Sequence, residues 1–416
     1  MIQHIYRCLV RILVFTIVVL GAAPYAPAAR PKPTVILISI DGFRYDYLDR
    51  IDAPTLRSLS ADGVRADSLI PQFPTLTFPN HYAIATGLLP AHNGIVANVI
   101  YDNKLSATFT MRDHSQVADS RWWGGEPIWV TSERQGQKSG IMFWPGSEAR
   151  IRGFRPSYWV PYDQSMPNHQ RVEQILKWID LPAEQRPTLL TLYFDEVDTA
   201  GHEFGPNSEQ LRGAVLNVDS SIQELVTALK QRSLFNDVNI VIVSDHGMAE
   251  TSCKQIIDVQ HLIDKNVIVG ERGAILTLYA KPYEAEKMLG KLQALAHLTV
   301  YRGSDTPPRW RYSGHTRIAN IIAVADEGWT IQTSAPSSQP KSCVGGMHGY
   351  DNQLPDLQGI FLAHGPEFRP GTRIPAFDNI DIYDLVAHLL KLKAAPNDGS
   401  LAPFVQVLRN QPAPSK

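Results

Sequence analysis

Apolar runs of strand length recur along the chain, and they constrain its fold more than any other feature. The runs are Thr34–Ile40 (TVILISI), Ser139–Trp144 (SGIMFW), Thr188–Phe194 (TLLTLYF), Asn239–Ser244 (NIVIVS), Ala274–Tyr279 (AILTLY), Ile318–Ala325 (IANIIAVA) and Gly359–Ala363 (GIFLA). Helical patterns lie between several of them, for example Ser208–Arg232. Continuous apolar strands that alternate with helices are typical of parallel sheets covered on both faces. The sequence therefore predicts an α/β fold with a largely parallel central sheet and helices on both faces.

The domain organisation predicted from the sequence is simple. A chain of 416 residues is long enough for one large domain or two ordinary ones. No internal repeat or low-complexity linker divides it, so we predict one domain over residues 29–416, in which residues 252–344 are a candidate subdomain. A net charge of -2 gives no electrostatic footprint for nucleic acid. It argues only weakly against an anionic substrate, because a bound metal supplies local positive charge.

The first 28 residues have the pattern of a secretory signal peptide. Arg7 and Arg11 precede an apolar core, Ile12–Leu20, and the small-residue stretch that follows ends in Ala26–Ala28. The alternative is a membrane anchor that stays attached, but the apolar run is short for a membrane span. We therefore expect cleavage, export, most simply to a bacterial periplasm, and no stable membrane span in the mature protein.

Signal cleavage would leave two of the three cysteines, Cys253 and Cys343. In an exported protein such a pair is a candidate disulfide. The alternative at this point is a pair of free buried thiols.

Acidic and imidazole side chains follow three of the apolar runs. Asp41 comes directly after the first run, Asp245 and His246 lie in SDHG at the end of another, and Asp198 and His202 lie in DEVDTAGH after a third. In open α/β sheets, ligands bind beyond the carboxyl ends of the strands. We therefore expect these side chains to lie at one edge of the sheet.

His348, in GGMHGYD, is a sixth candidate metal ligand, because its flanking glycines let the backbone approach closely. Carboxylates and imidazoles together suit zinc or a similar divalent ion. Six such side chains are too many for one tetrahedral site, but they suit two sites of the kind that promotes in-line phosphoryl transfer. A single strand-end Asp is usually a turn or capping residue, so the prediction depends on the three motifs occurring together.

Thr77 is the candidate nucleophile in the stretch PTLTFPNHYAIATGLLPAHNGIV (Pro74–Val96). A threonine hydroxyl is inert unless a base or a metal lowers its pKa. If a helix starts at Thr77, Pro79 lies in its first turn and the Phe78 N–H faces a possible anion. The alternative is that Thr77 only caps the helix. His81 and His92 match no metal-ligand position.

These motifs resemble one known family. IDGFR, the threonine stretch, FWPGSEA, DEVDTAGH, SDHGM and GGMHGYDN occur in this order over residues 40–352. They resemble the nucleotide pyrophosphatase/phosphodiesterase family of the alkaline phosphatase superfamily. The resemblance implies an alkaline-phosphatase-like fold with two zinc ions per chain. It assigns one zinc to Asp198, His202 and His348, and the other to Asp41, Asp245, His246 and the Thr77 oxygen.

The resemblance also implies roles for the neighbouring residues. Thr77 would be the nucleophile, while Asn98 and the Phe78 N–H would hold a phosphoryl oxygen. The rings of Phe78 and Tyr162 would sandwich a nucleobase in a slot whose other lining residues are Trp144, Pro145 and Tyr193. Core packing is the alternative role for each of these aromatic residues.

Two further features can be compared with the family. Cysteines in the positions of Cys253 and Cys343 imply a bridge between the His348 and Asp245–His246 loops. Several family members carry lysine just before the nucleophile, where this chain has Leu76, so one cation near the substrate phosphates is missing.

The function implied is an exported phosphodiesterase that releases nucleoside 5′-monophosphates through a covalent threonine intermediate. Its partner would be a small nucleotide or another phosphodiester, and no oligomeric state is indicated. The alternatives are a lysophospholipid or choline-type phosphodiesterase, a phosphomonoesterase or phosphonate hydrolase, and a non-catalytic metal-binding protein. A sulfatase would need Cys or Ser in a C-x-P-x-R context, which the sequence lacks.

Overall fold

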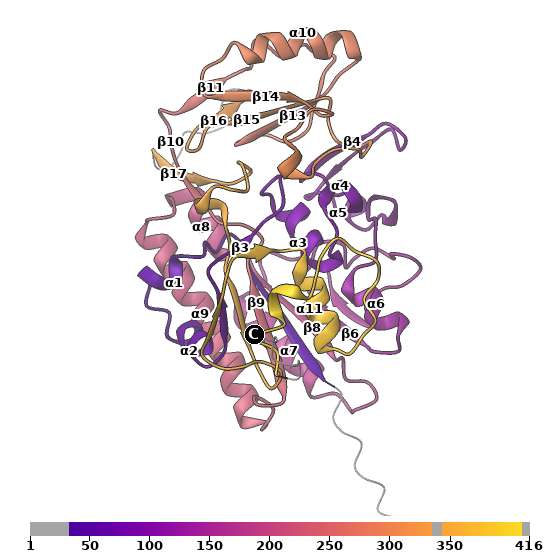
Figure 1. The fold of residues 1–416 in the computed structure, drawn as a ribbon, viewed down its shortest axis with the longest axis vertical. Coiled ribbons are helices and arrows are strands. Elements are labelled where there is room, and N and C mark those ends of the chain that lie inside the picture. The colour runs from indigo at the N-terminus through magenta and orange to yellow at the C-terminus, as the bar shows by residue number, and fades with distance from the viewer. Residues whose placement is uncertain (1–32, 335–342, 410–416) are drawn as a thin grey trace, which may run out of the picture. The chain divides into compact units, whose positions relative to one another are not determined.

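A computed structural model describes residues 33–334 and 343–409 (Figure 1). The predicted signal peptide, residues 1–28, therefore lies outside the described residues. Within the described part of the chain, no helix combines the length and the apolar character needed to cross a membrane.

An eight-stranded sheet forms the centre of the described fold. Its order is β19 (Thr372–Ile374), β2 (Val64–Ala66), β18 (Phe361–His364), β9 (Val238–Val243), β1 (Thr34–Ile40), β8 (Leu189–Phe194), β6 (Ser139–Met142), β7 (Tyr158–Val160). The five strands from β9 to β7 are parallel, and only β18 runs against its neighbours. The predicted α/β fold with a largely parallel sheet is confirmed.

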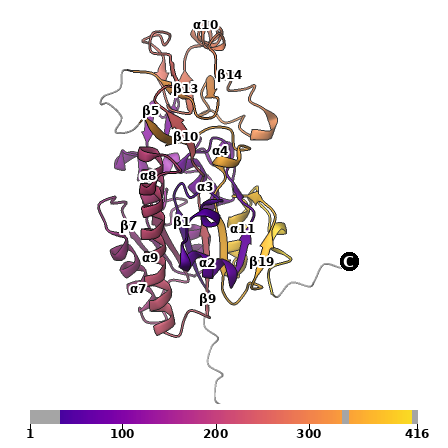
Figure 2. The same cartoon turned by 90° about the vertical axis from the view of Figure 1, so that its left-hand side faces the viewer.

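Helices cover both faces of this sheet because its strands are apolar on both sides. Along β1, Val35 and Leu37 pack into one core and Ile36 and Ile38 into the other. The first core includes side chains of α3 (Thr77–Thr86), α6 (Ile128–Arg134) and α11 (Asp381–Leu389). The second includes side chains of α2 (Pro54–Ala61), α7 (Asn168–Ile179) and α9 (Glu209–Gln231). Figure 2 shows α7 and α9 on one side of the sheet and α11 on the other.

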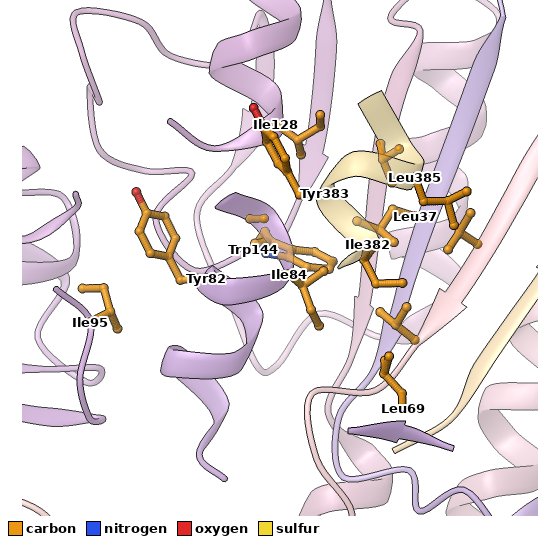
Figure 3. Close-up of a cluster of buried hydrophobic side chains, with 14 of the residues drawn as sticks. Leu37, Leu69, Tyr82, Ile84, Ile95, Ile128, Trp144, Ile382, Tyr383 and Leu385 are labelled. Carbon is orange, nitrogen blue, oxygen red and sulfur yellow. The ribbon is translucent and has the colours of Figure 1, made fainter. Parts of the chain in front are cut away.

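The first core is tightly interlocked around β1. Leu37 lies among Ile84 of α3 and Ile382 of α11, as Figure 3 shows. Full burial of an aliphatic side chain of this size contributes about 1.5–3 kcal/mol. This core therefore fixes α3, the helix that begins at Thr77, against the central strand.

Helix α9 agrees closely with the predicted helix Ser208–Arg232. Its N-cap is Ser208, whose hydroxyl oxygen accepts a hydrogen bond from the Leu211 N–H at 3.1 Å. Leu211, Val215 and Val218 continue an apolar stripe of helical spacing that is buried against the sheet.

A second, smaller sheet contains two of the predicted strands. Its order is β12 (Ile268–Val269), β13 (Ile275–Tyr279), β15 (Ile321–Ala325), β14 (Leu298–Arg302), and all its pairings are antiparallel. The runs Ala274–Tyr279 and Ile318–Ala325 are therefore strands, but they do not belong to the parallel sheet. A strand buried on both faces reads as an apolar run in either sheet type, so the run does not encode strand direction. The division of the chain into a domain and a 252–344 subdomain stays a prediction.

The remaining described elements connect these layers. The strands form the pairs β3 (Leu69–Ile70) with β20 (Phe377–Asp378), β4 (Val99–Asp102) with β5 (Ala107–Thr110), β10 (Ala249–Ser252) with β17 (Val344–Met347), and β11 (Ile256–Asp258) with β16 (Thr330–Gln332). The other helices are α1 (Tyr47–Arg50), α4 (Pro90–Asn93), α5 (His114–Val117), α8 (Glu196–Phe204) and α10 (Pro282–Gln293), with short 3-10 turns at Ser120–Trp122, Pro308–Trp310, Pro355–Leu357 and Ala402–Phe404.

Candidate functional site

The carboxyl ends of β1, β8 and β9 bring the predicted ligand residues together. The three strands are parallel neighbours with β1 in the middle. Asp41 follows β1, Asp245 and His246 follow β9, and α8 carries Asp198 and His202 beyond β8. His348 comes from elsewhere, directly after β17.

Asp198, His202 and His348 form one group of possible ligands, whose donor atoms all lie within 4.8 Å of one another. Asp198 Oδ1 is 3.4 Å from His202 Nε2 and 3.6 Å from His348 Nε2. The two Nε2 atoms are 3.0 Å apart.

Asp41, Asp245 and His246 form a second group with the same spacing. His246 Nε2 is 3.0 Å from Asp245 Oδ2 and 3.4 Å from Asp41 Oδ1. Thr77 Oγ1 lies 3.4 Å from the same nitrogen. The groups adjoin, because the rings of His246 and His348 stack with centroids 3.6 Å apart.

The hydrogen bonds of the three histidines define which ring nitrogen faces the site. The Nδ1 atoms of His202, His246 and His348 lie 2.8–2.9 Å from the carbonyl oxygens of Gly346, Gly247 and Thr75, respectively. A carbonyl oxygen only accepts, so each Nδ1 carries the proton and donates. In the neutral rings, Nε2 is left with a lone pair that points into the site, as in metal-binding histidines.

The residues present fit a pair of divalent cations. Asp41 Oδ1, Asp198 Oδ1 and Asp245 Oδ2 are buried and have no hydrogen-bond partner among the described residues. Burial raises the pKa of Asp41, and the carboxylates of Asp245 and Asp198 raise it further. Burial lowers the pKa of His348, as do the rings of His246 and His202. Unpaired carboxylate oxygens that face imidazole lone pairs are the donor set that zinc and similar cations prefer.

Gly42 allows the two groups to approach each other. Its φ angle is +66°, and its N–H donates to Asp245 Oδ1 at 3.2 Å. A Cβ at this position would lie 2.9 Å from the Cα of Asp198. Only glycine combines this backbone conformation with this separation.

Thr77 is the first residue of α3, and Leu76 is the N-cap, so Thr77 does not serve as the cap. The Asn80 side chain holds the turn before the helix. Asn80 Oδ1 accepts from the Gln72 N–H at 2.7 Å, and its Nδ2 donates to Pro74 O at 3.0 Å and Leu76 O at 2.9 Å. The position of the Thr77 hydroxyl is therefore fixed by the buried turn that precedes it.

Phe78 and Asn98 are joined by a hydrogen bond, in which the Phe78 N–H donates to Asn98 Oδ1 at 2.9 Å. The contact of this N–H with a phosphoryl oxygen stays a prediction. The helix N-terminus offers an unpaired donor, and the nearest acceptor is the Asn98 amide oxygen. The amide nitrogen of Asn98 is consequently the group left to face a ligand.

The predicted nucleobase residues line one cleft of about 660 Å³ together with Thr77 and Asn98. The candidate ligands that line it are Asp41, Asp198, His202 and His348. Tyr162 is 37% exposed, and its hydroxyl donates to Asp195 Oδ2 at 3.1 Å. Tyr193 and Trp144 are buried: the Tyr193 hydroxyl donates to Asp41 Oδ2 at 2.6 Å, and Trp144 Nε1 donates to His81 O at 2.9 Å. Pro145 and Phe78 complete the set.

Sequence reasoning did not select His81, yet the structure places it beside the candidate ligands. Its ring is buried, with Nδ1 2.9 Å from Thr77 O and 3.3 Å from Asp245 Oδ2. Its Nε2 lies 2.8 Å from the Ser39 hydroxyl. The available signal was its spacing of four residues from Thr77, which places both on one face of a helix.

The expected bridge between Cys253 and Cys343 is present, with the Cα atoms 4.8 Å apart. It closes the end of the antiparallel pair β10–β17, where the Cys253 N–H donates to Cys343 O at 2.8 Å. Because β17 leads directly into His348, the disulfide restrains the strand that presents this histidine.

Comparison with known proteins identifies the family. The model of the type I phosphodiesterase / nucleotide pyrophosphatase family matches residues 35–351, which is more than half of the chain. The chain belongs to this family. Venom phosphodiesterase CdcPDE of Crotalus durissus collilineatus is 37% identical over 411 residues, 95% of this chain and 49% of that protein. Ectonucleotide pyrophosphatase/phosphodiesterase family member 3 of Bos taurus is 37% identical over 91% of this chain and 44% of that protein.

As a member of the phosphodiesterase family, the chain spans about half the length of the curated relatives just named. A solved structure matches most of it: murine ectonucleotide pyrophosphatase/phosphodiesterase 5, an inactive threonine-to-alanine variant in complex with AMP. The TM-score is 0.85 at 35% identity, over 91% of this chain and 100% of that chain. The predicted alkaline-phosphatase-like fold is thereby confirmed.

Proposed function

We propose that the protein is a two-metal nucleotide pyrophosphatase/phosphodiesterase that uses Thr77 as its nucleophile. The observation that carries the proposal is the position of Thr77 Oγ1, 3.4 Å from His246 Nε2. It lies in the cleft that Asp41 and the first ligand group also line. Family membership supports the reaction class. The inactive threonine-to-alanine form of the murine relative supports a threonine nucleophile.

The proposed mechanism assigns a separate task to each group of residues. Asp198, His202 and His348 would hold one zinc ion, and Asp41, Asp245, His246 and Thr77 the other. When bound, such cations lower the pKa of a hydroxyl group and offset the charge of a leaving oxygen. Thr77 Oγ1 attacks phosphorus and loses its proton to solvent, while the bond from phosphorus to the leaving oxygen breaks. Water then hydrolyses the nucleotidyl-threonine and releases a nucleoside 5′-monophosphate.

Asn98 would stabilise the charge that develops on a phosphoryl oxygen. Its Oδ1 is occupied by the Phe78 N–H, so its Nδ2 is the donor available to the substrate. One preorganised donor of this kind contributes about 2.7–4 kcal/mol to a transition state.

The cleft has aromatic residues for the base of a nucleotide and cationic residues for its phosphates. Phe78 and Tyr162 would sandwich the base, and the AMP bound by the murine relative supports a nucleotide ligand. Leu76, in place of the family lysine, is buried, and its side chain lies close to Gly349. Arg112 and Arg272 line the same cleft and are exposed, so positive charge is available from other positions. Export through the predicted signal peptide completes the proposal.

The deciding experiment compares wild type, Thr77→Ala and Thr77→Ser after loading with zinc. We expect Thr77→Ala to abolish cleavage of p-nitrophenyl thymidine 5′-phosphate while it keeps nearly two zinc ions, and Thr77→Ser to retain measurable turnover. Turnover by Thr77→Ala, or wild-type activity that is indifferent to EDTA, would refute the mechanism. Wild-type preference for p-nitrophenyl phosphate or lysophosphatidylcholine would instead support the monoesterase or lipid alternative.

A further inference from the structure

Glu271 is a buried carboxylate beside the candidate active site that the mechanism above does not use. It lies in the connection between β12 and β13 of the small antiparallel sheet, is 9% exposed and lines the cleft. Its backbone N–H donates to Thr277 Oγ1 at 2.7 Å, which fixes the residue to β13. The sequence offered no motif around it.

The Glu271 carboxylate is bound almost entirely by backbone groups. Its Oε2 accepts from the N–H groups of Asn98 at 3.0 Å and Val99 at 3.3 Å, and its Oε1 accepts from the Arg272 N–H at 3.2 Å. Among the described residues, no lysine, arginine or histidine side chain forms an ion pair with it. Figure 1 shows β4, which begins at Val99, next to the small sheet that supplies Glu271.

A carboxylate is electrostatically unfavourable at this place. Burial raises the pKa of Glu271, and the hydrogen bonds from Arg272, Asn98 and Val99 counter that rise. The cleft is proposed to receive an anionic phosphate, which a nearby carboxylate would repel. Because the charge of Glu271 would repel the substrate, we expect this residue to act by positioning a neighbour. The neighbour that it positions is Asn98.

Asn98 is held by three hydrogen bonds. Glu271 fixes its backbone N–H, and the Phe78 N–H fixes its side-chain oxygen. Its own carbonyl oxygen accepts from the Met111 N–H at 3.2 Å. With the backbone and Oδ1 both held, the direction of the remaining amide nitrogen is determined.

We infer that Glu271 is a positioning residue that aims the Asn98 amide nitrogen at the phosphoryl oxygen, so that the small antiparallel sheet acts on the chemical step. This inference rests on the proposed function. It differs from a purely structural role, in which loss of Glu271 would lower stability and leave the reaction unchanged.

The test uses Glu271→Ala, Glu271→Gln and a matched control, Asp219→Ala. Asp219 of α9 is 4% exposed and accepts from the N–H groups of Thr55 and Leu56, but it does not line the cleft. For p-nitrophenyl thymidine 5′-phosphate, we expect Glu271→Ala to lower kcat about 10²–10³-fold, as for loss of one oxyanion donor, with zinc content little changed. Glu271→Gln keeps one acceptor oxygen, so its kcat should be at least about tenfold higher than that of Glu271→Ala. Asp219→Ala should lower Tm and leave kcat unchanged.

A double-mutant cycle connects Glu271 to Asn98. If Glu271 acts through Asn98, Asn98→Ala and Asn98→Ala/Glu271→Ala should have the same kcat, because coupled residues are non-additive. Additive losses would overturn the inference. It would also be overturned if Glu271→Ala, like the Asp219 control, changed Tm alone.

A binding measurement separates this inference from the proposed reaction. In zinc-loaded Thr77→Ala protein, the Kd of AMP can be measured by calorimetry without any turnover. We expect Glu271→Ala and Asn98→Ala to raise this Kd by similar factors, whereas Asp219→Ala should not. An unchanged Kd in Glu271→Ala would overturn the positioning role. A wild type that cleaves no diester would refute the proposed function alone.

Discussion

Replacement of Gly42 by alanine tests whether the site depends on the close approach of β1 and α8. A Cβ at position 42 would lie 2.9 Å from Asp198 Cα, 3.0 Å from its Cβ and 3.1 Å from its Oδ1. Favourable carbon contacts are about 3.5–4.0 Å, so one segment must shift by more than half an ångström, about 0.6 Å or more. The atoms that would shift belong to a candidate metal ligand.

Two costs add up in Gly42→Ala, and a second glycine separates them. The positive φ angle alone costs about 1–2 kcal/mol for a residue with a Cβ. Overpacking against Asp198 adds about 1–3 kcal/mol. Gly153 has a φ angle of +84°, but a Cβ there would meet nothing within 4 Å. Gly153→Ala therefore carries the backbone cost without the steric one.

The assay is zinc retention during dialysis against a competing chelator, together with thermal unfolding. Changes next to metal ligands typically weaken metal binding about 10–100-fold. We expect that loss in Gly42→Ala, with a lowered Tm, and only a lowered Tm in Gly153→Ala. If both variants retained zinc equally well, the close contact with Asp198 would not shape the site.

Three further outcomes follow from features away from Gly42. Replacement of both Cys253 and Cys343 by serine should lower the free energy of unfolding by about 4–5 kcal/mol, as expected for a closed loop of this size, which chemical denaturation measures. The same change should speed the loss of zinc to a chelator, because it frees the strand before His348. Burial raises the pKa of the Asp381 carboxyl to about 7. The stability that its protonated form contributes is therefore complete below pH 3.8 and is lost as the pH rises towards 7. Asp381→Asn should accordingly become more stable than wild type between about pH 5 and 8, as measured by thermal melts. Tyr162→Ala should raise KM for a nucleotide ester about tenfold, in line with the loss of one stacking contact, and should affect bis-p-nitrophenyl phosphate less.

The sequence was sufficient to predict the parts of the structure that depend on strong local patterns. Apolar runs located β1, β8 and β9, and the ends of these strands indicated both ligand groups. The helix Ser208–Arg232 differed from α9 by one residue at each end. These features are local because a buried strand or an amphipathic helix must repeat apolar residues at a fixed spacing.

Other features depend on contacts that no local pattern encodes. The orientation of β18, and the membership of β13 and β15 in a separate sheet, are set by distant pairing partners. The carbonyl oxygens that orient the histidines belong to the backbone and have no residue signature. Glu271 was missed for the same reason, because two of its three partners are the N–H groups of residues more than 170 positions earlier.

The spread of the ligands along the chain has a consequence for assembly. Asp198 and His202 occupy successive turns of α8, and Asp245 and His246 are neighbours, so each of these pairs can form locally. His348 joins Asp198 and His202 only after a long chain segment has closed, and closure of long loops slows folding. The order of events should therefore be capture of a cation by a local pair, followed by completion of the shell when His348 arrives. Because the Cys253–Cys343 bond shortens that search, cysteine oxidation would determine how quickly newly made chains acquire their full set of ligands.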